Sequence, residues 1–189
     1  MRWDVRAFDL FAPVYDLLMP PTDGVTLRKG FATADRDINR ILEIGGGSGR
    51  VADEIGATVV DPARGMVRQA RRRGLETVRA SATDLPHPDG SVDAIVVVDA
   101  FHHFPEGQRC LSEMARVLAP GGVLVISDFD RGTRLGWALD QAERLVRFDS
   151  TFYTVSELES AIASTGLSVR PIEYGFETTV AGVKPPVDR

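Results

Sequence analysis

The chain has 189 residues, of which 43% are hydrophobic and 26% are charged, and its formal net charge is −5. This length and composition predict one globular domain that can bury a sizeable core. The acidic balance argues against a polyanion as the main partner, because proteins that bind nucleic acid usually present a basic face. The single cysteine, Cys110, excludes an internal disulfide. We find no apolar run long enough to cross a bilayer and no signal-peptide pattern, so we expect a cytoplasmic protein without a transmembrane segment.

In chain order, a helical pattern covers residues 4–19 with an interruption at Pro13, and a second short helix is expected near residues 24–36. Strands and helices then alternate. We expect strands at 40–44, 58–61, 77–80, 94–99 and 123–127, and helices at 50–55, 63–73, 105–118, 134–147 and 155–164. Thr154 or Ser156 is the expected cap of the last of these helices. Two closing strands, 167–174 and 177–183, have no helix between them and should pair as an antiparallel hairpin.

This alternation predicts an α/β fold with a doubly wound, Rossmann-like sheet. The sheet should have seven strands and be mostly parallel, with an antiparallel C-terminal hairpin and helices on both faces. We expect a single domain over residues 1–189. Within it, residues 1–36 would form an N-terminal helical lid segment, residues 40–128 the core, and residues 129–189 the remaining helices and the final strand hairpin.

A glycine-rich turn follows the first buried strand. After Glu43, glycine recurs as Gly45, Gly47 and Gly49. Without a Cβ the backbone can turn tightly and touch a ligand, and the next helix directs free N–H groups and its dipole to the same place. A dinucleotide-binding loop would need glycine where this chain has Arg50, and a phosphate-binding P-loop would need a nearby lysine, which is absent. The pattern favours a ligand-binding loop, with a purely structural turn as the alternative.

The carboxyl ends of the predicted strands give the other candidate positions, because ligands of open α/β sheets bind there. Asp61 ends the second strand and can accept hydrogen bonds from both hydroxyls of a ribose. The alternative is an exposed aspartate that caps the next helix. The remaining strand ends fall at residues 81–84, 99–103 and 128.

The glycine motif, Glu43-x-Gly45-x-Gly47-x-Gly49, resembles the first motif of the class I S-adenosylmethionine-dependent methyltransferases. Three further stretches resemble the small-molecule branch of that family: SATDLP at 81–86, PDGSVD at 88–93 and FHHF at 101–104. RVLAPGGVL at 116–124 resembles the family's turn into its fifth strand. FDLFAPVYD at 8–16 and VAGVKP at 180–185 resemble the ends of ubiquinone and menaquinone C-methyltransferases, which phospholipid N-methyltransferases share.

The resemblance implies that the cofactor is S-adenosyl-L-methionine and the product S-adenosyl-L-homocysteine. It assigns the cofactor to residues at the strand ends: Glu43, Gly45, Gly46, Gly47, Gly49, Asp61, Pro62, Met66, Ser81, Ala82, Thr83, Asp99 and Ala100. In one respect the chain departs from the family pattern. Ser81 stands where the family has an aspartate that contacts the adenine amino group, so it can still accept a hydrogen bond but supplies no charge.

Four residues are predicted on the acceptor side: Asp99, His102, His103 and Tyr15. Asp128 and Tyr153 are further candidates near the methyl group. A base is needed only if the nucleophile must lose a proton, and neutral histidine is a suitable acceptor. Because adjacent side chains diverge in helices and strands, we expect at most one of the two histidines to be catalytic and the other to pack or cap a helix. No metal site is expected, since the spacings typical of metal ligands are absent.

The sequence therefore predicts in-line methyl transfer to a small-molecule, quinol or lipid-like acceptor, by a monomer or homodimer that can touch a membrane transiently. The alternatives are N-methylation of a lipid headgroup or small amine, a cofactor-binding partner subunit without activity of its own, and, more distantly, a dinucleotide-dependent oxidoreductase. No nucleic acid is expected to bind. The five arginines at 64, 68 and 71–73 have the spacing of the solvent-exposed face of one helix.

Overall fold

The computed structural model describes residue 9, residues 24–145 and residues 150–186. The helix expected over 4–19, and Tyr15 with it, lie outside the described residues except for Asp9. In chain order the helices are α2 Gly24–Phe31, α3 Arg50–Ile55, α4 Arg64–Arg72, α5 Gly107–Val117, α6 Arg134–Leu145 and α7 Val155–Ala163. The strands are β1 Ile41–Ile44, β2 Thr58–Val60, β3 Thr77–Val78, β4 Val92–Val98, β5 Leu118–Phe129, β6 Ser168–Glu173 and β7 Glu177–Val183.

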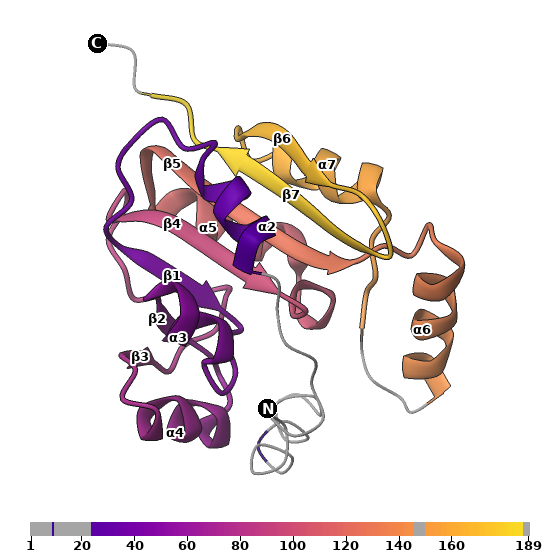
Figure 1. The fold of residues 1–189 in the computed structure, drawn as a ribbon, viewed down its shortest axis with the longest axis horizontal. Helices are drawn as coiled ribbons and strands as arrows, with labels where there is room; N and C mark the ends of the chain where they lie inside the picture. The colour runs from indigo at the N-terminus through magenta and orange to yellow at the C-terminus, as the bar shows by residue number, and fades with distance from the viewer. Residues whose placement is uncertain (1–8, 10–23, 146–149, 187–189) are drawn as a thin grey trace.

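The strands form one seven-stranded sheet in the order β3-β2-β1-β4-β5-β7-β6. The pairs among β1 to β5 are parallel, whereas β7 is antiparallel to both β5 and β6. The predicted fold class is therefore confirmed, including the closing hairpin. Figure 1 shows α2 in front of the sheet with α5 and α7 behind it, and α6 beyond the end of β5.

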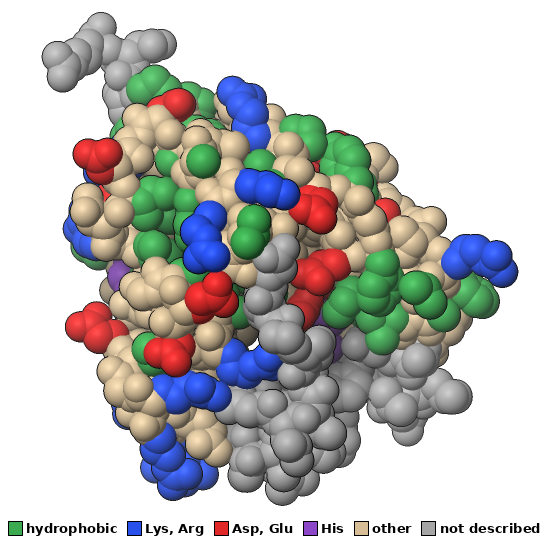
Figure 2. All heavy atoms as spheres, in the orientation of Figure 1, with side chains coloured by type: hydrophobic (Ala, Val, Ile, Leu, Met, Phe, Trp, Pro, Cys, Tyr) green, Lys and Arg blue, Asp and Glu red, His purple; other side chains and the backbone are tan. Residues whose placement is uncertain are grey.

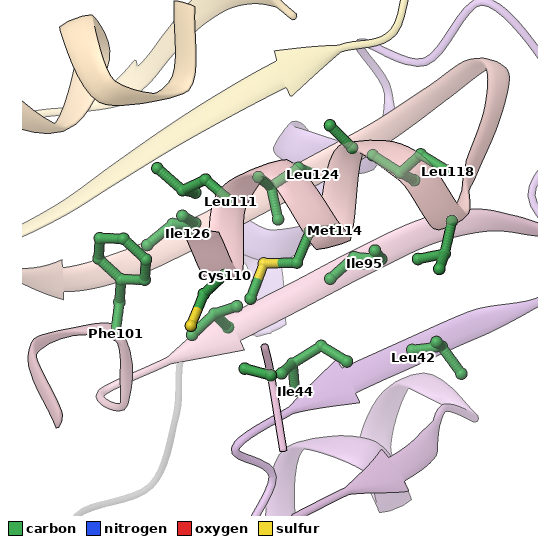
Figure 3. Close-up of a cluster of buried hydrophobic side chains, with 14 of the residues drawn as sticks. Leu42, Ile44, Ile95, Phe101, Cys110, Leu111, Met114, Leu118, Leu124 and Ile126 are labelled. Carbon is green, nitrogen blue, oxygen red and sulfur yellow. The ribbon is translucent and has the colours of Figure 1, made fainter. Parts of the chain in front are cut away.

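Burial on both faces explains why β4 and β5 read as nearly continuous apolar runs. The larger core cluster joins β1, β4 and β5 to α5, with Ile44, Ile95, Leu111, Met114 and Ile126 at its centre (Figure 3). A second cluster packs Leu27 of α2 and Val51 of α3 against the opposite face. The two clusters fix the sheet from both sides, so the carboxyl ends of its parallel strands are held at one edge.

Several elements differ from the expected boundaries; for example, α2 ends at Phe31 instead of near residue 36, and β4 begins at Val92 instead of at residue 94. The strand predicted at 123–127 runs from Leu118 to Phe129. Gly121 donates its backbone N–H to the carbonyl of Lys184, and the carbonyl of Gly122 accepts the N–H of Lys184. These two bonds continue the pairing with the end of β7. The helix predicted at 105–118 starts only at Gly107. It is preceded by the one-turn 3₁₀ helix η1, Phe101–His103, which the periodicity did not indicate. Thr154 is confirmed as the cap of α7, in a reciprocal capping box with Glu157.

Candidate functional site

The glycine loop after β1 is held in shape by its own backbone. Gly45 donates to the carbonyl of Val60 at the end of β2, and Gly49 donates to the carbonyl of Gly46. Gly45, Gly47 and Gly49 all have positive φ, a region that other residues enter only with strain. A Cβ on Gly45 would lie 2.9 Å from the Cβ of Ala100, so the loop also packs directly against a residue two positions after the end of β4.

The glycines differ in what surrounds them. A Cβ on Gly49 would lie 2.4 Å from Leu75 Cδ1 and 3.2 Å from Val59 Cγ2, so this glycine allows α3 to pack closely on the sheet. Among the described residues, a Cβ on Gly47 would meet only Met66 Sδ, at 3.7 Å. No other residue in the described ranges fills the space in front of Gly47, so these ranges leave room there for a ligand.

Glu43 lies beneath this loop. Its side chain is 3% exposed, and its Oε2 accepts the Ala52 N–H in the first turn of α3 at 2.9 Å. Burial raises the pKa of Glu43 to about 8, the bond from Ala52 opposes this rise, and the charge of Asp61 adds to it. In the structure, this predicted cofactor residue stabilises the start of α3 through its hydrogen bond with the Ala52 N–H.

Asp61 joins the two strand ends at the centre of the site. Oδ2 accepts the Gly47 N–H at 3.0 Å, and Oδ1 accepts the Ala63 N–H at 2.7 Å. Burial raises the pKa of Asp61 to about 6, while these two backbone bonds oppose the rise. Each carboxylate oxygen can accept a further hydrogen bond, so the side chain keeps capacity for ligand hydroxyls. It is also buried, which differs from the alternative of an exposed helix cap.

Asp9, in the N-terminal part of the chain, contacts the start of α4 close to Asp61. Oδ1 of Asp9 accepts the Gly65 N–H at 2.6 Å, near the start of α4. The charge of Asp9 contributes to the raised pKa of Asp61. Pro62 is exposed beside them and Met66 is buried. The structure therefore brings Gly47, Asp61 and Met66 together, as the sequence predicts.

The turn after β3 holds the residues predicted on the adenine side. The Ser81 hydroxyl lies 2.8 Å from that of Thr83 and accepts the Thr83 N–H at 3.3 Å, so it is engaged within its own turn. Ala82 is buried next to them. Its backbone N–H forms no hydrogen bond with another described residue, which leaves it available to a ligand.

Asp99, directly after β4, combines three unusual features. Its φ is +48°, a strained value for a residue with a side chain. Its Oδ1 is buried, and no described residue donates a hydrogen bond to it. Burial, together with the carboxylates of Glu177 and Asp128, raises the pKa of Asp99 to about 7, against the opposing influence of His102 and Arg50. Strain and an unsatisfied buried acceptor cluster at functional positions in proteins.

The two histidines follow in η1. His102 is 3% exposed, and its Nδ1 lies 2.6 Å from Oδ1 of Asp128 at the end of β5. His103 is half-buried, and its Nδ1 lies 3.0 Å from the Ser150 hydroxyl. The expectation that the two side chains diverge is wrong, because η1 is a tight turn that places the ring centroids 4.0 Å apart.

The segment 150–154 packs against η1, which contains His102 and His103 and is called the double-histidine turn below. Thr151 donates its N–H to the His102 carbonyl at 2.7 Å, and the ring of Phe152 stacks on that of His102 at 4.4 Å and 13°. The sequence pattern did not single out Ser150, Thr151 or the stacking role of Phe152. The only available signal was their position just before the capped start of α7.

Two surface hollows are lined by described residues, and their lining includes neither the glycine loop nor Asp61. One lies against Asp128, Phe129 and Tyr153 and has room for about one water molecule. The other is an open groove at the opposite end of the sheet, near Arg116 and Lys184, whose amino group is bonded to the last carbonyls of α5. Tyr153 OH lies close to Gly107.

Within the described ranges, no helix is long and apolar enough to cross a bilayer. Residues 24–145 and 150–186, with Asp9, also contain no group of three potential metal ligands. The arginines at 64, 68 and 71–73 are exposed, as expected, and Figure 2 shows basic side chains gathered over α4 at the lower left.

Residues 42–126 match the family model described as a methyltransferase domain. A demethylmenaquinone methyltransferase from Thermus thermophilus is 35% identical over 140 residues, which cover 65% of this chain and 64% of that protein. A fatty-acid O-methyltransferase from Mycolicibacterium smegmatis is 37% identical over 108 residues, covering 51% and 39%. The chain thus spans less than two thirds of the length of these relatives.

Solved structures agree on the fold. A SAM-dependent methyltransferase from Thermotoga maritima superimposes with a TM-score of 0.78 at 24% identity, covering 97% of this chain and 100% of that one. A chain from the complex between the Trm112 methyltransferase activator and a methyltransferase of Haloferax volcanii gives 0.77 at 21% identity, covering 94% and 97%. The matched residues 42–126 contain the glycine loop, Asp61, Asp99 and both histidines, so this part of the chain is similar to a methyltransferase domain, and the fold is similar to that of SAM-dependent methyltransferases.

Proposed function

We propose that this protein binds S-adenosylmethionine at the carboxyl edge of its sheet and transfers the methyl group to a small-molecule, quinol or lipid-like acceptor. One observation carries the proposal: the Gly47 N–H is bonded to the buried carboxylate of Asp61, which joins the loop after β1 to the end of β2. This geometry places an open glycine backbone and a hydrogen-bond acceptor next to each other.

The residues present fit such a cofactor. The ribose hydroxyls would donate to Asp61, the adenine ring would meet the free Ala82 N–H, and the open face of Gly47 would accommodate close approach of the ligand. The buried Oδ1 of Asp99 has no donor among the described residues, and the ammonium group of the methionine part would supply one. Ser81 would contribute little, because its hydroxyl is engaged by Thr83.

When bound, the cofactor supplies an activated methyl carbon, so the protein's main task is to position the acceptor and exclude water. In this proposal the glycine loop and Asp61 hold the nucleoside, and Asp99 lies between the loop and the double-histidine turn. His102 and His103 line the acceptor side. Tyr15 keeps its predicted place there as part of the proposal.

The named relatives support a small or lipid-like acceptor, since one acts on a demethylmenaquinone and another on a fatty acid, as their names state. N-methylation of a lipid headgroup or small amine is the alternative within this chemistry. A cofactor-binding subunit that needs a partner is a second candidate. It is favoured because the Ser81 hydroxyl is hydrogen-bonded to Thr83 within the same turn, and because one structural neighbour comes from a complex with a methyltransferase activator.

The test is transfer of label from methyl-labelled S-adenosylmethionine to a panel containing a naphthoquinol, a phenol, a fatty acid and a primary amine. We expect turnover on at least one compound, and a loss of turnover in Asp99→Asn, whose neutral side chain keeps the shape. Binding of the cofactor without turnover on any acceptor, restored by adding a cell extract, would instead favour the partner-dependent subunit.

A further inference from the structure

The turn that carries the Ala82 N–H closes on itself. Asp84 donates its N–H to the carbonyl of Ser81 at 3.1 Å, and these two residues form an isolated antiparallel bridge. Thr83 donates its N–H to the Ser81 hydroxyl at 3.3 Å. Residues 81–84 are thus a small unit, and the Ala82 N–H in it is not bonded to any other described residue. The direction of this N–H depends on how the unit is held from outside.

The unit is held through Leu85, which follows it directly. Oε1 of Glu113 accepts the Leu85 N–H at 2.8 Å, and Nη2 of Arg116 donates to the Leu85 carbonyl at 3.1 Å. Glu113 and Arg116 lie about one turn apart on α5. The Leu85 side chain is 3% exposed and packs in the larger core cluster. Both backbone groups and the side chain of Leu85 are therefore fixed, and α5 supplies the two backbone bonds.

Arg116 and Glu113 also hold each other. Nε and Nη2 of Arg116 donate to Oε2 and Oε1 of Glu113, each at 2.8 Å. Nη1 donates to the His87 carbonyl at 2.9 Å and to Oδ1 of Asp89 at 2.6 Å. All five N–H groups of the guanidinium are therefore bonded, which requires the planar fork of arginine. The bond from Arg116 holds the pKa of Glu113 below its usual value, so this carboxylate remains an ionised acceptor.

Recognition of a base would depend on this rigidity. The Ser81 hydroxyl is engaged by Thr83, so the proposed contact with adenine depends on the Ala82 N–H. A hydrogen bond weakens steeply when its donor is misaligned. A single donor can therefore select a ring nitrogen only if the turn that carries it does not rotate.

We propose that Glu113 and Arg116 are positioning residues for the adenine base of the cofactor. Their two bonds to Leu85 fix the turn 81–84, so that the free N–H in this turn is directed at an acceptor nitrogen of the ring. This inference rests on the proposed function. It makes the selection of adenine depend on α5 as well as on the end of β3, and it gives both side chains a role that needs no contact with the cofactor.

The test compares two ligands that differ in the base. S-adenosylhomocysteine carries adenine, whereas S-inosylhomocysteine carries hypoxanthine, in which one acceptor nitrogen of the ring bears a hydrogen. We expect the wild type to bind the adenine ligand roughly 5–100-fold more tightly in calorimetry, since a donor left without an acceptor is costly. In Arg116→Lys, which keeps the charge but loses the fork, this ratio should fall below about threefold. Arg109→Lys, at an exposed position of the same helix, should keep the wild-type ratio.

The ratio of affinities separates positioning from stability. A variant that only unfolds more easily would keep the wild-type ratio, because its folded fraction binds both ligands as before. Glu113→Gln should also lower the ratio, but less, because its amide oxygen can still accept the Leu85 N–H. A wild-type ratio in Arg116→Lys, or equal affinity of the wild type for both ligands, would overturn the inference. A wild type that binds neither ligand would refute the proposed function itself.

Discussion

The proposed nucleoside edge of the site and its proposed acceptor side are built in different ways. The nucleoside edge consists of short turns, each following its own strand: Gly45–Gly49 after β1 and Asp61 after β2. On the acceptor side, by contrast, His102 meets Asp128 from 26 residues away and Phe152 from a segment beyond α6. Local turn chemistry determines the first region, whereas tertiary packing determines the second.

This difference predicts which amino-acid substitutions each region can tolerate. A loop made of consecutive residues has its geometry set by backbone dihedral angles, so single changes at glycine should act sharply and locally. A site assembled from distant segments depends on every element that positions it. We make four predictions that test this difference between the two regions.

The largest effect is expected from a matched pair of glycine substitutions. Gly49→Ala adds a Cβ 2.4 Å from Leu75 at φ +81°, and overpacking with backbone strain should lower the free energy of unfolding by about 2–4 kcal/mol. Gly47→Ala has φ +53°, but among the described residues its Cβ would meet only Met66 Sδ at 3.7 Å, so it should cost only about 1–2 kcal/mol while weakening binding of S-adenosylmethionine. Urea unfolding and calorimetry measure the two effects. Equal losses of stability would show that both glycines serve packing alone.

The buried carboxyl beneath the loop gives the next effect. Because burial raises the pKa of Glu43 to about 8, the folded state binds its proton more tightly than the unfolded state. Its contribution to stability is complete below about pH 4.5 and is lost as the pH rises towards 8. Glu43→Gln mimics the protonated form. At pH 8–9 the free energy of unfolding of this variant should therefore exceed that of the wild type by about 1–3 kcal/mol. Thermal melts from pH 5 to 9 that run parallel for both proteins would contradict this.

Cofactor binding should itself depend on pH through Asp61. Its pKa is about 6, so the carboxylate is mostly protonated at pH 5 and mostly ionised at pH 7. An ionised acceptor forms the stronger bonds to hydroxyl groups, and affinity for S-adenosylmethionine should rise by up to about tenfold over this interval. The rise should disappear in Asp61→Asn. A profile of the same shape in the variant would assign the titration to another group.

The smallest effect is expected on the exposed face of α4. Arg68→Gln and Arg72→Gln remove charges that point to solvent, and each should change the free energy of unfolding by less than about 0.5 kcal/mol. Cofactor affinity should be unchanged as well. A marked loss in either measurement would show that this face contributes to the site.

The sequence could predict the order of strands and helices because buried parallel strands and amphipathic helices leave clear periodic patterns. It also placed Asp61 and Asp99 at strand ends and Gly47 in the loop after the first strand, which is where they lie. It could not predict η1 or the positive φ of Asp99, which arise from packing at the end of β4. It likewise gave no sign of the stacking of Phe152 on His102, because contacts between distant segments leave no local pattern.

The most direct test of the central claim is calorimetric titration of S-adenosylmethionine into the purified protein and into Asp61→Asn. We expect micromolar binding that weakens by about 1.5–3 kcal/mol in the variant, the usual contribution of a hydrogen bond to a charged group. Asp53→Asn, in α3, is the matched control and should bind as the wild type does. Absence of binding, or equal affinity in the wild type and Asp61→Asn, would contradict the assignment of the cofactor to this edge of the sheet.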